Sequence, residues 1–165
     1  MPTEIKNNFK EPINIVRYLL FRFSFDGDLI TNLKMQKLLY YAYVWSLVLN
    51  KERCFEEKFQ AWPNGPVMAS IYEELKIFGS SPIESDFTKI GNDGDLQKLK
   101  ESIGEELISI LDQVYKIYGT KSPFELVTLT HNESPWSKAR QGLDDAEPSN
   151  NEINDEDVLL EYEKK

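Results

Sequence analysis

The sequence contains very little cysteine or histidine: its 165 residues include only Cys54 and His131 of these two types. A single cysteine excludes an intrachain disulfide and a cysteine-based zinc site. The longest uncharged apolar-rich run, residues 38–50, is shorter than the ~20 residues of a membrane span. The N-terminus has no apolar region typical of a signal peptide. We therefore expect a reduced, cytoplasmic protein without a membrane partner.

Positive charge is also scarce, because 28 acidic residues face 19 basic ones and the net charge at pH 7 is −9. Such a balance is unlike that of proteins that bind nucleic acid by neutralising phosphates, so we expect no direct nucleic-acid binding. The excess of acidic over basic residues is unevenly distributed along the chain. Residues 144–165 hold nine acids and two lysines, whereas residues 1–143 hold 19 acids and 17 bases. The sequence predicts a nearly neutral body followed by an acidic C-terminal segment, 144–165.

Apolar and aromatic residues are abundant, since 41% of the chain is hydrophobic and it contains nine Phe, eight Tyr and three Trp. This length and composition predict one domain with a sizeable core. The spacing of apolar residues favours a mainly α fold: a single compact helical domain around a central helix at about 31–50, which is apolar on nearly every side. The polar residues 1–11 are expected to be loose, and the domain to span 12–162.

Prolines and glycines indicate where the surrounding helices begin and end. We expect helices to start at Pro12, Pro66, Pro123 and Pro135, a long helical stretch over 96–118 with a break near Gly104, and a last acidic helix after 154. Residues 55–62 alternate with period two and predict a short strand. Residues 87–90 could pair with it, giving one short two-stranded β element.

The residues that could take part in catalysis do not form a recognisable active-site pattern in the sequence. His131 lies near Glu133 and Ser134, which suggests a small hydrolase, but a triad is defined by spatial roles, and a histidine here also suits the end of a helix. Cys54 could act as a nucleophile only with His131 as its base. The sequence contains no phosphate loop, dinucleotide fingerprint or metal-ligand spacing. We therefore expect no catalytic residues, no metal and no cofactor, and a protein that is not an enzyme.

Two features suggest contact with another protein. Lys34 and Lys37 lie in the first turns of the central helix, where the helix dipole disfavours cations. They either pair with acids such as Asp26 or Asp28, or contact an acidic partner. A tryptophan beside the 63–66 turn belongs either to the core or to an exposed binding patch. The candidate partner-binding residues are Lys34, Lys37, Trp62 and Asn64.

Three sequence segments occur together: 33–42 (LKMQKLLYYA), 61–67 (AWPNGPV) and 129–136 (LTHNESPW). In this order and spacing they resemble the Panacea domain of SocA-like antitoxins, also described as phage-associated proteins, and the resemblance runs from about 12 to 161. The motif residues look like scaffold rather than site; they are Leu38, Tyr41, Gly65, Pro66, His131, Pro135 and Trp136.

The resemblance implies a largely helical domain that binds and neutralises a toxin encoded beside it, and it brings no catalytic residues. The SocA-like branch also implies an alternative, an adaptor that delivers its toxin to a bacterial ATP-dependent protease. Many relatives carry an extra N-terminal region that often binds DNA, whereas only eleven residues precede Pro12 here. We expect loop 80–95, the two lysines and the acidic segment to face the toxin.

Overall fold

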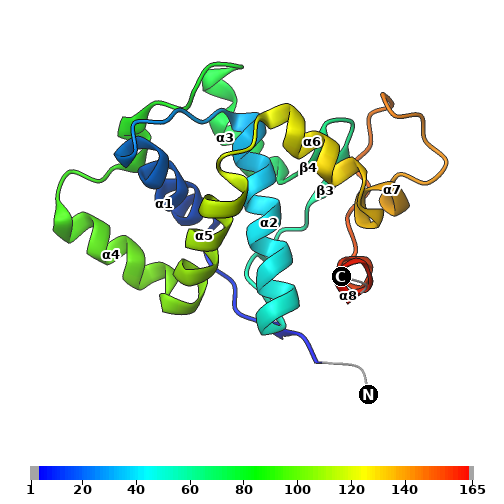
Figure 1. Ribbon diagram of the computed structural model, residues 1–165, viewed down its shortest axis with the longest axis horizontal. Helices are drawn as coiled ribbons and strands as arrows, with labels where there is room; N and C mark the ends of the chain where they lie inside the picture. The colour runs from blue at the N-terminus through cyan, green and yellow to red at the C-terminus, as the bar shows by residue number, and fades with distance from the viewer. Residues whose placement is uncertain (1–3, 164–165) are drawn as a thin grey trace.

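The computed structural model describes residues 4–163. These residues form eight α-helices, one of which lies at the centre of the others. Helix α2 (Asn32–Asn50) runs through the middle of the molecule, with helices on both sides of it (Figure 1). It is buried along nearly its whole length, from Asn32 to Leu47. The mainly α fold and the central helix predicted from the sequence are confirmed.

The remaining helices lie around α2. On one side are α1 (Pro12–Phe25), α4 (Asp93–Ile103) and α5 (Glu105–Tyr118); on the other are α7 (Ser134–Ala139) and α8 (Asp155–Glu163), with α3 (Ala69–Leu75) and α6 (Pro123–His131) near the upper end (Figure 1). Short 3₁₀ turns η1 (Lys76–Phe78) and η2 (Ser85–Thr88) follow α3. None of the helices in the described residues is long and apolar enough to cross a membrane.

Local capping explains why the helix ends were predictable. The Thr31 side chain accepts a hydrogen bond from the Lys34 amide at the start of α2. Ser122 and Glu125 form a reciprocal capping box at the start of α6. Gly104, with φ of +92°, separates α4 from α5 at the predicted break. Each of these signals involves residues within one turn of each other.

The short β element differs from its prediction. Strands β3 (Gln60–Trp62) and β4 (Gly65–Val67) form an antiparallel hairpin in which Trp62 pairs with Gly65. Pro66 therefore lies in a strand and does not open a helix. Residues 85–88 form a 3₁₀ turn rather than a partner strand, because the two-residue loop already brings β4 beside β3.

The acidic segment 144–165 forms the second edge of this hairpin, as far as the structure describes it. The Ala61 amide donates to the Asn151 carbonyl (2.8 Å), and the Ile153 amide donates to the Phe59 carbonyl (2.8 Å). Ile153, Val158 and Tyr162 are buried, and α8 packs against α2. The apolar side chains of the acidic segment therefore complete the core, while Asp155 is held by Tyr43 and Arg53.

The N-terminal residues described are also ordered by pairing. Strand β1 (Lys6–Asn7) runs parallel to β2 (Glu52–Arg53), and the Lys10 amide donates to the Cys54 carbonyl (2.7 Å). The expectation of a loose 1–11 is therefore wrong for residues 4–11, because their backbone hydrogen bonds have partners after α2. Residues 1–3 lie outside the described part of the chain.

Candidate functional site

The three sequence segments meet at Gly65. This glycine has φ of +103°, a conformation that side chains with a Cβ rarely adopt. A Cβ placed there would lie 2.7 Å from Lys37 Cε and 2.8 Å from Thr130 Oγ1. The central helix, the hairpin and α6 therefore approach one another so closely at this point that only glycine fits.

Lys37 is fully buried, in contrast to its predicted place on a contact surface. Its Nζ atom donates to the Pro66 carbonyl oxygen at 3.0 Å, and burial lowers the pKa of its ammonium to about 7. In the described residues it forms no ion pair, so the alternative pairing with Asp26 or Asp28 is wrong as well. A side chain enclosed by the hairpin cannot contact a partner.

Lys34 is also largely buried rather than presented to solvent. Its Nζ donates to the Gly119 carbonyl at the end of α5 (2.6 Å) and lies 5.1 Å from the Phe23 ring centroid. Burial lowers the pKa of Lys34, and the charge of Asp28 partly opposes that shift. Lys34 stabilises the packing of α5 on α2. Because both lysines are buried, neither belongs to the candidate contact surface.

His131 ends α6 and stacks on Trp136, with ring centroids 3.8 Å apart and planes 15° apart. Its Nε2 atom is buried and has no hydrogen-bond partner within residues 4–163. Burial lowers the pKa of His131, although a hydrogen bond to the backbone of Pro63 opposes this. The Trp136 indole in turn donates to the Trp62 carbonyl (2.8 Å). This imidazole is a packed ring that joins α6 and α7 to the hairpin.

The other groups considered for catalysis have structural partners. The Glu133 carboxylate accepts hydrogen bonds from the Tyr41 hydroxyl (3.0 Å) and the Tyr162 hydroxyl (2.6 Å). It thereby connects α2 with α8. Cys54 is buried, and its burial raises the pKa of the thiol to about 12, so the thiolate is not populated near neutral pH. Residues 4–163 contain no group of three or more metal-ligating side chains.

Arg140 is a residue that the sequence reasoning missed. It is buried, and its guanidinium lies over the Trp136 ring (5.3 Å to the centroid). Nη1 donates to the Ala61 carbonyl (2.8 Å), while Nη2 donates to the carbonyls of Asp144 (2.8 Å) and Glu147 (2.6 Å). Because these partners are backbone oxygens, no side-chain pattern identifies them; the only signal is a lone arginine just before an acidic loop.

An open hollow lies beside this buried cluster, at the N-terminal end of α2. Its volume is about 460 Å³. Trp62 and Asn64 both line it, so the structure brings two of the four predicted contact residues together. The Trp62 ring packs edge-on against Tyr72 (4.9 Å between centroids), and its Nε1 donates to Gln60 Oε1 (2.9 Å). We call this feature the Trp62 hollow; its lining also includes Leu33, Gln36, Lys76 and Pro123.

Large apolar side chains are exposed at, or directly after, lining residues of the Trp62 hollow, and we call these three, Leu33, Ile77 and Phe124, its apolar border. Phe124 follows the lining residue Pro123 and is 78% exposed, and Ile77 follows Lys76 and is 84% exposed. Leu33 itself is 36% exposed. A hollow with exposed apolar side chains at or next to its lining residues is typical of a surface that binds another protein. The sequence did not indicate it, because exposure depends on how the helix ends meet.

Comparison with known proteins gives one match. A family model described as "Antitoxin SocA-like, Panacea domain" matches residues 35–137. No curated protein and no solved structure matches the chain. The matched range includes the Lys37–Gly65 contact and most of the Trp62 hollow, whereas Arg140, the acidic segment and α8 lie beyond it.

Proposed function

The chain belongs to the family of SocA-like antitoxins with a Panacea domain, and from that premise we propose that it neutralises a cognate toxin by binding it directly and without catalysis. The observation that carries the proposal is the Trp62 hollow with its exposed apolar border. It lies on residues of the matched domain and beside a tightly packed core. The groups that could have served catalysis, His131 and Cys54, have packing roles instead.

The proposed toxin contacts are centred on Trp62 and Asn64. Trp62 is half-buried and held by Gln60 and Tyr72, so little side-chain entropy is lost when a partner covers it. Asn64 is exposed at the tip of the hairpin and offers an amide to a partner. Leu33 and Phe124 supply apolar area around them. Aromatic anchors with an apolar surround are the usual centre of a protein–protein interface.

The proposal is tested by co-expression with the product of the neighbouring gene. That product alone is expected to stop growth, and this protein to restore it through a stable complex. Phe124→Asp and Leu33→Asp are expected to weaken the complex at least tenfold, because they place a charge in the apolar border. The matched control is Leu160→Asp, since Leu160 is an exposed leucine on α8 outside the Trp62 hollow; it should leave binding unchanged.

Two results would contradict the proposal. A neighbouring product that is neither toxic nor bound would remove the antitoxin function. Full binding by both border variants would remove the Trp62 hollow as the contact surface. The same strains distinguish neutralisation from delivery to an ATP-dependent protease, because delivery shortens the half-life of the toxin whereas neutralisation leaves a stable complex.

A further inference from the structure

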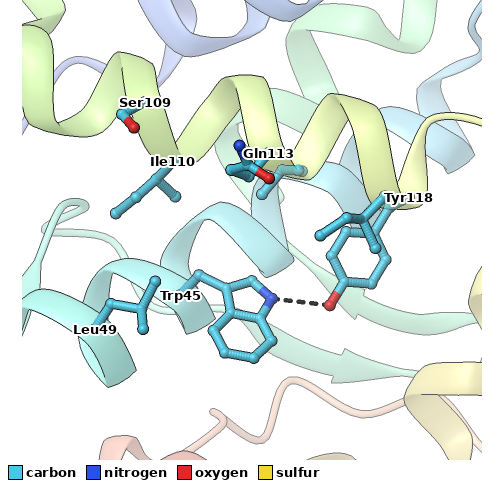
Figure 2. Close-up of a pocket in the computed structure, with 8 residues that line it drawn as sticks. Trp45, Leu49, Ser109, Ile110, Gln113 and Tyr118 are labelled. Carbon is cyan, nitrogen blue, oxygen red and sulfur yellow. Dashed lines mark hydrogen bonds between the residues drawn. The ribbon is translucent and has the colours of Figure 1, made fainter.

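A second concave surface lies between α2 and α5, away from the Trp62 hollow. Trp45 and Leu49 project from α2 toward Ile110 and Tyr118 on α5 across a groove of about 270 Å³ (Figure 2). Its floor is buried, whereas Leu49 is 65% exposed at its edge. The opposite edge carries Ile117, which is 53% exposed. We call this feature the Trp45 groove.

The floor of the Trp45 groove is apolar and held in place. The Trp45 indole donates its hydrogen bond to the Tyr118 hydroxyl (2.8 Å), so this donor needs no partner from a ligand (Figure 2). Tyr118 stacks on Tyr41 with centroids 4.1 Å apart, and Tyr162 of α8 packs edge-on against Trp45 (5.0 Å). Such a preformed surface favours aliphatic side chains that fill it without polar cost.

Charge is distributed unequally along the groove. Glu106 lies one helical turn before the lining residue Ile110, on the same face of α5, which places it at one end of the groove. Glu105 and Glu106 also line the neighbouring hollow that contains Lys10. Lys116 precedes Ile117 near the other end. Helix α8, whose Tyr162 packs against Trp45, carries acidic side chains over Asp155–Glu163, of which Asp155 and Asp157 are paired with Arg53 and Lys138. A bound segment would therefore meet the negative charge of Glu106 at one end of the groove.

We propose that the Trp45 groove binds a basic amphipathic helix of the toxin. A groove between two packed helices accommodates a third helix, whose aliphatic residues at i, i+3 or i+4, and i+7 fill it. Its lysines or arginines lie over Glu106, which has complementary charge. The inference rests on the toxin-binding function proposed above and adds the chemistry of a second contact that the Trp62 hollow does not provide.

The test uses the full chain and two synthetic helical peptides of ~18 residues. Both peptides carry leucine at the groove-facing positions; one has lysine at the flanking positions and the other has glutamate. Titration calorimetry is expected to show the lysine peptide binding at least tenfold more tightly. The double variant Glu105→Gln, Glu106→Gln should reduce the difference in affinity between the two peptides. Equal binding of the two peptides, or no binding of either, would overturn the proposal.

Surface variants locate the peptide on the protein. Ile117→Glu and Leu49→Glu are expected to reduce lysine-peptide binding at least tenfold, and because both side chains are exposed their melting temperatures should match the wild type. Phe124→Glu, in the border of the Trp62 hollow, should bind the peptide normally. Peptide binding that is insensitive to Ile117→Glu would overturn the groove as the site.

Binding of the neighbouring gene product tests whether a toxin helix occupies the Trp45 groove. Ile117→Glu is expected to weaken the complex with the neighbouring gene product, as Phe124→Glu does through the other surface. A toxin complex that is unaffected by Ile117→Glu, while peptide binding is lost, would show that the occupant is not a toxin helix. Failure of the wild-type chain to bind the neighbouring product would instead refute the proposed function, and the peptide titrations would still decide the chemistry of the groove.

Discussion

The Nζ atom of Lys37 donates a hydrogen bond to the carbonyl oxygen of Pro66, 3.0 Å away, inside the core of the domain. This contact attaches the β3–β4 hairpin to the central helix. It also places an ionisable amine where water does not reach it. The stability of the domain should consequently depend on the protonation of this one amine.

Lys37→Met is expected to change how stability depends on pH. Burial lowers the pKa of Lys37 to about 7, so between pH 7 and about 10.5 the unfolded chain holds a proton that the folded chain has released. The wild type should gain stability as pH rises through this window, by at most ~1.4 kcal/mol per pH unit. Urea unfolding at pH 6.5, 8 and 9.5 measures this for both proteins.

The Lys37→Met variant is the reference for the wild type, because the two proteins share every titrating group except Lys37. Its stability relative to the wild type should be highest at pH 6.5 and should fall toward pH 9.5. A difference that stays constant over the window would show that Lys37 keeps its charge in the folded protein.

Gly65→Ala is expected to destabilise the domain by ~3 kcal/mol or more, because the added methyl group meets Lys37 and Thr130 in a backbone conformation that already disfavours alanine. Gly142→Ala is the matched control. Gly142 also has positive φ (+88°), but a Cβ there has no atom within 4 Å, so only ~1 kcal/mol of backbone strain is expected. Thermal and urea unfolding of the two variants compare them; equal losses would contradict the close packing at Gly65.

His131→Phe should preserve the stack on Trp136; it loses the hydrogen bond to the Pro63 backbone but also removes a buried Nε2 that has no partner among residues 4–163. We expect its stability at pH 7.5 to lie within ~1 kcal/mol of the wild type. Because burial lowers the pKa of His131, the unfolded chain binds a proton more readily below pH 6.5, and the wild type should lose stability relative to the variant as pH falls from 7 to 5. Parallel pH curves of the two proteins would contradict this.

Arg140→Lys is expected to cost ~2–4 kcal/mol, because an ammonium cannot reproduce the fork of hydrogen bonds to Ala61, Asp144 and Glu147. Lys138→Ala, two residues earlier at the end of α7, is the control. It removes an exposed ion pair with Asp157 at 3.4 Å and should cost less than ~1 kcal/mol. Amide hydrogen exchange should rise in 59–62 and 144–153 for Arg140→Lys alone; protection equal to the wild type would refute the role of Arg140.

The parts of this fold that the sequence predicted are those determined within a few residues. Pro12, the Ser122–Glu125 capping box and the break at Gly104 specify helix ends through contacts along one turn. The apolar character of α2 on nearly every side likewise indicated a central position. These signals need no knowledge of distant residues.

The errors concern contacts between residues far apart in the chain. Ile153 pairs with Phe59, and nothing near either residue indicates the other. The burial of Lys37 also runs against the general exposure of lysine, and its partner is a backbone carbonyl. For the candidate site, the sequence proposed Trp62 and Asn64, which line one hollow, but the apolar border and the Trp45 groove depend on how helices from different parts of the chain pack.

The docking of α8 has a consequence for biosynthesis. A chain leaves the ribosome N-terminus first, so the Phe59 carbonyl, the Ala61 amide and the Trp45 ring that Tyr162 contacts lack these partners until residues 151–162 have emerged. Any product that ends earlier, through a nonsense codon or a cut in the 142–150 loop, exposes apolar surface that degradation machinery recognises. Only chains translated through α8 therefore reach the complete fold described above.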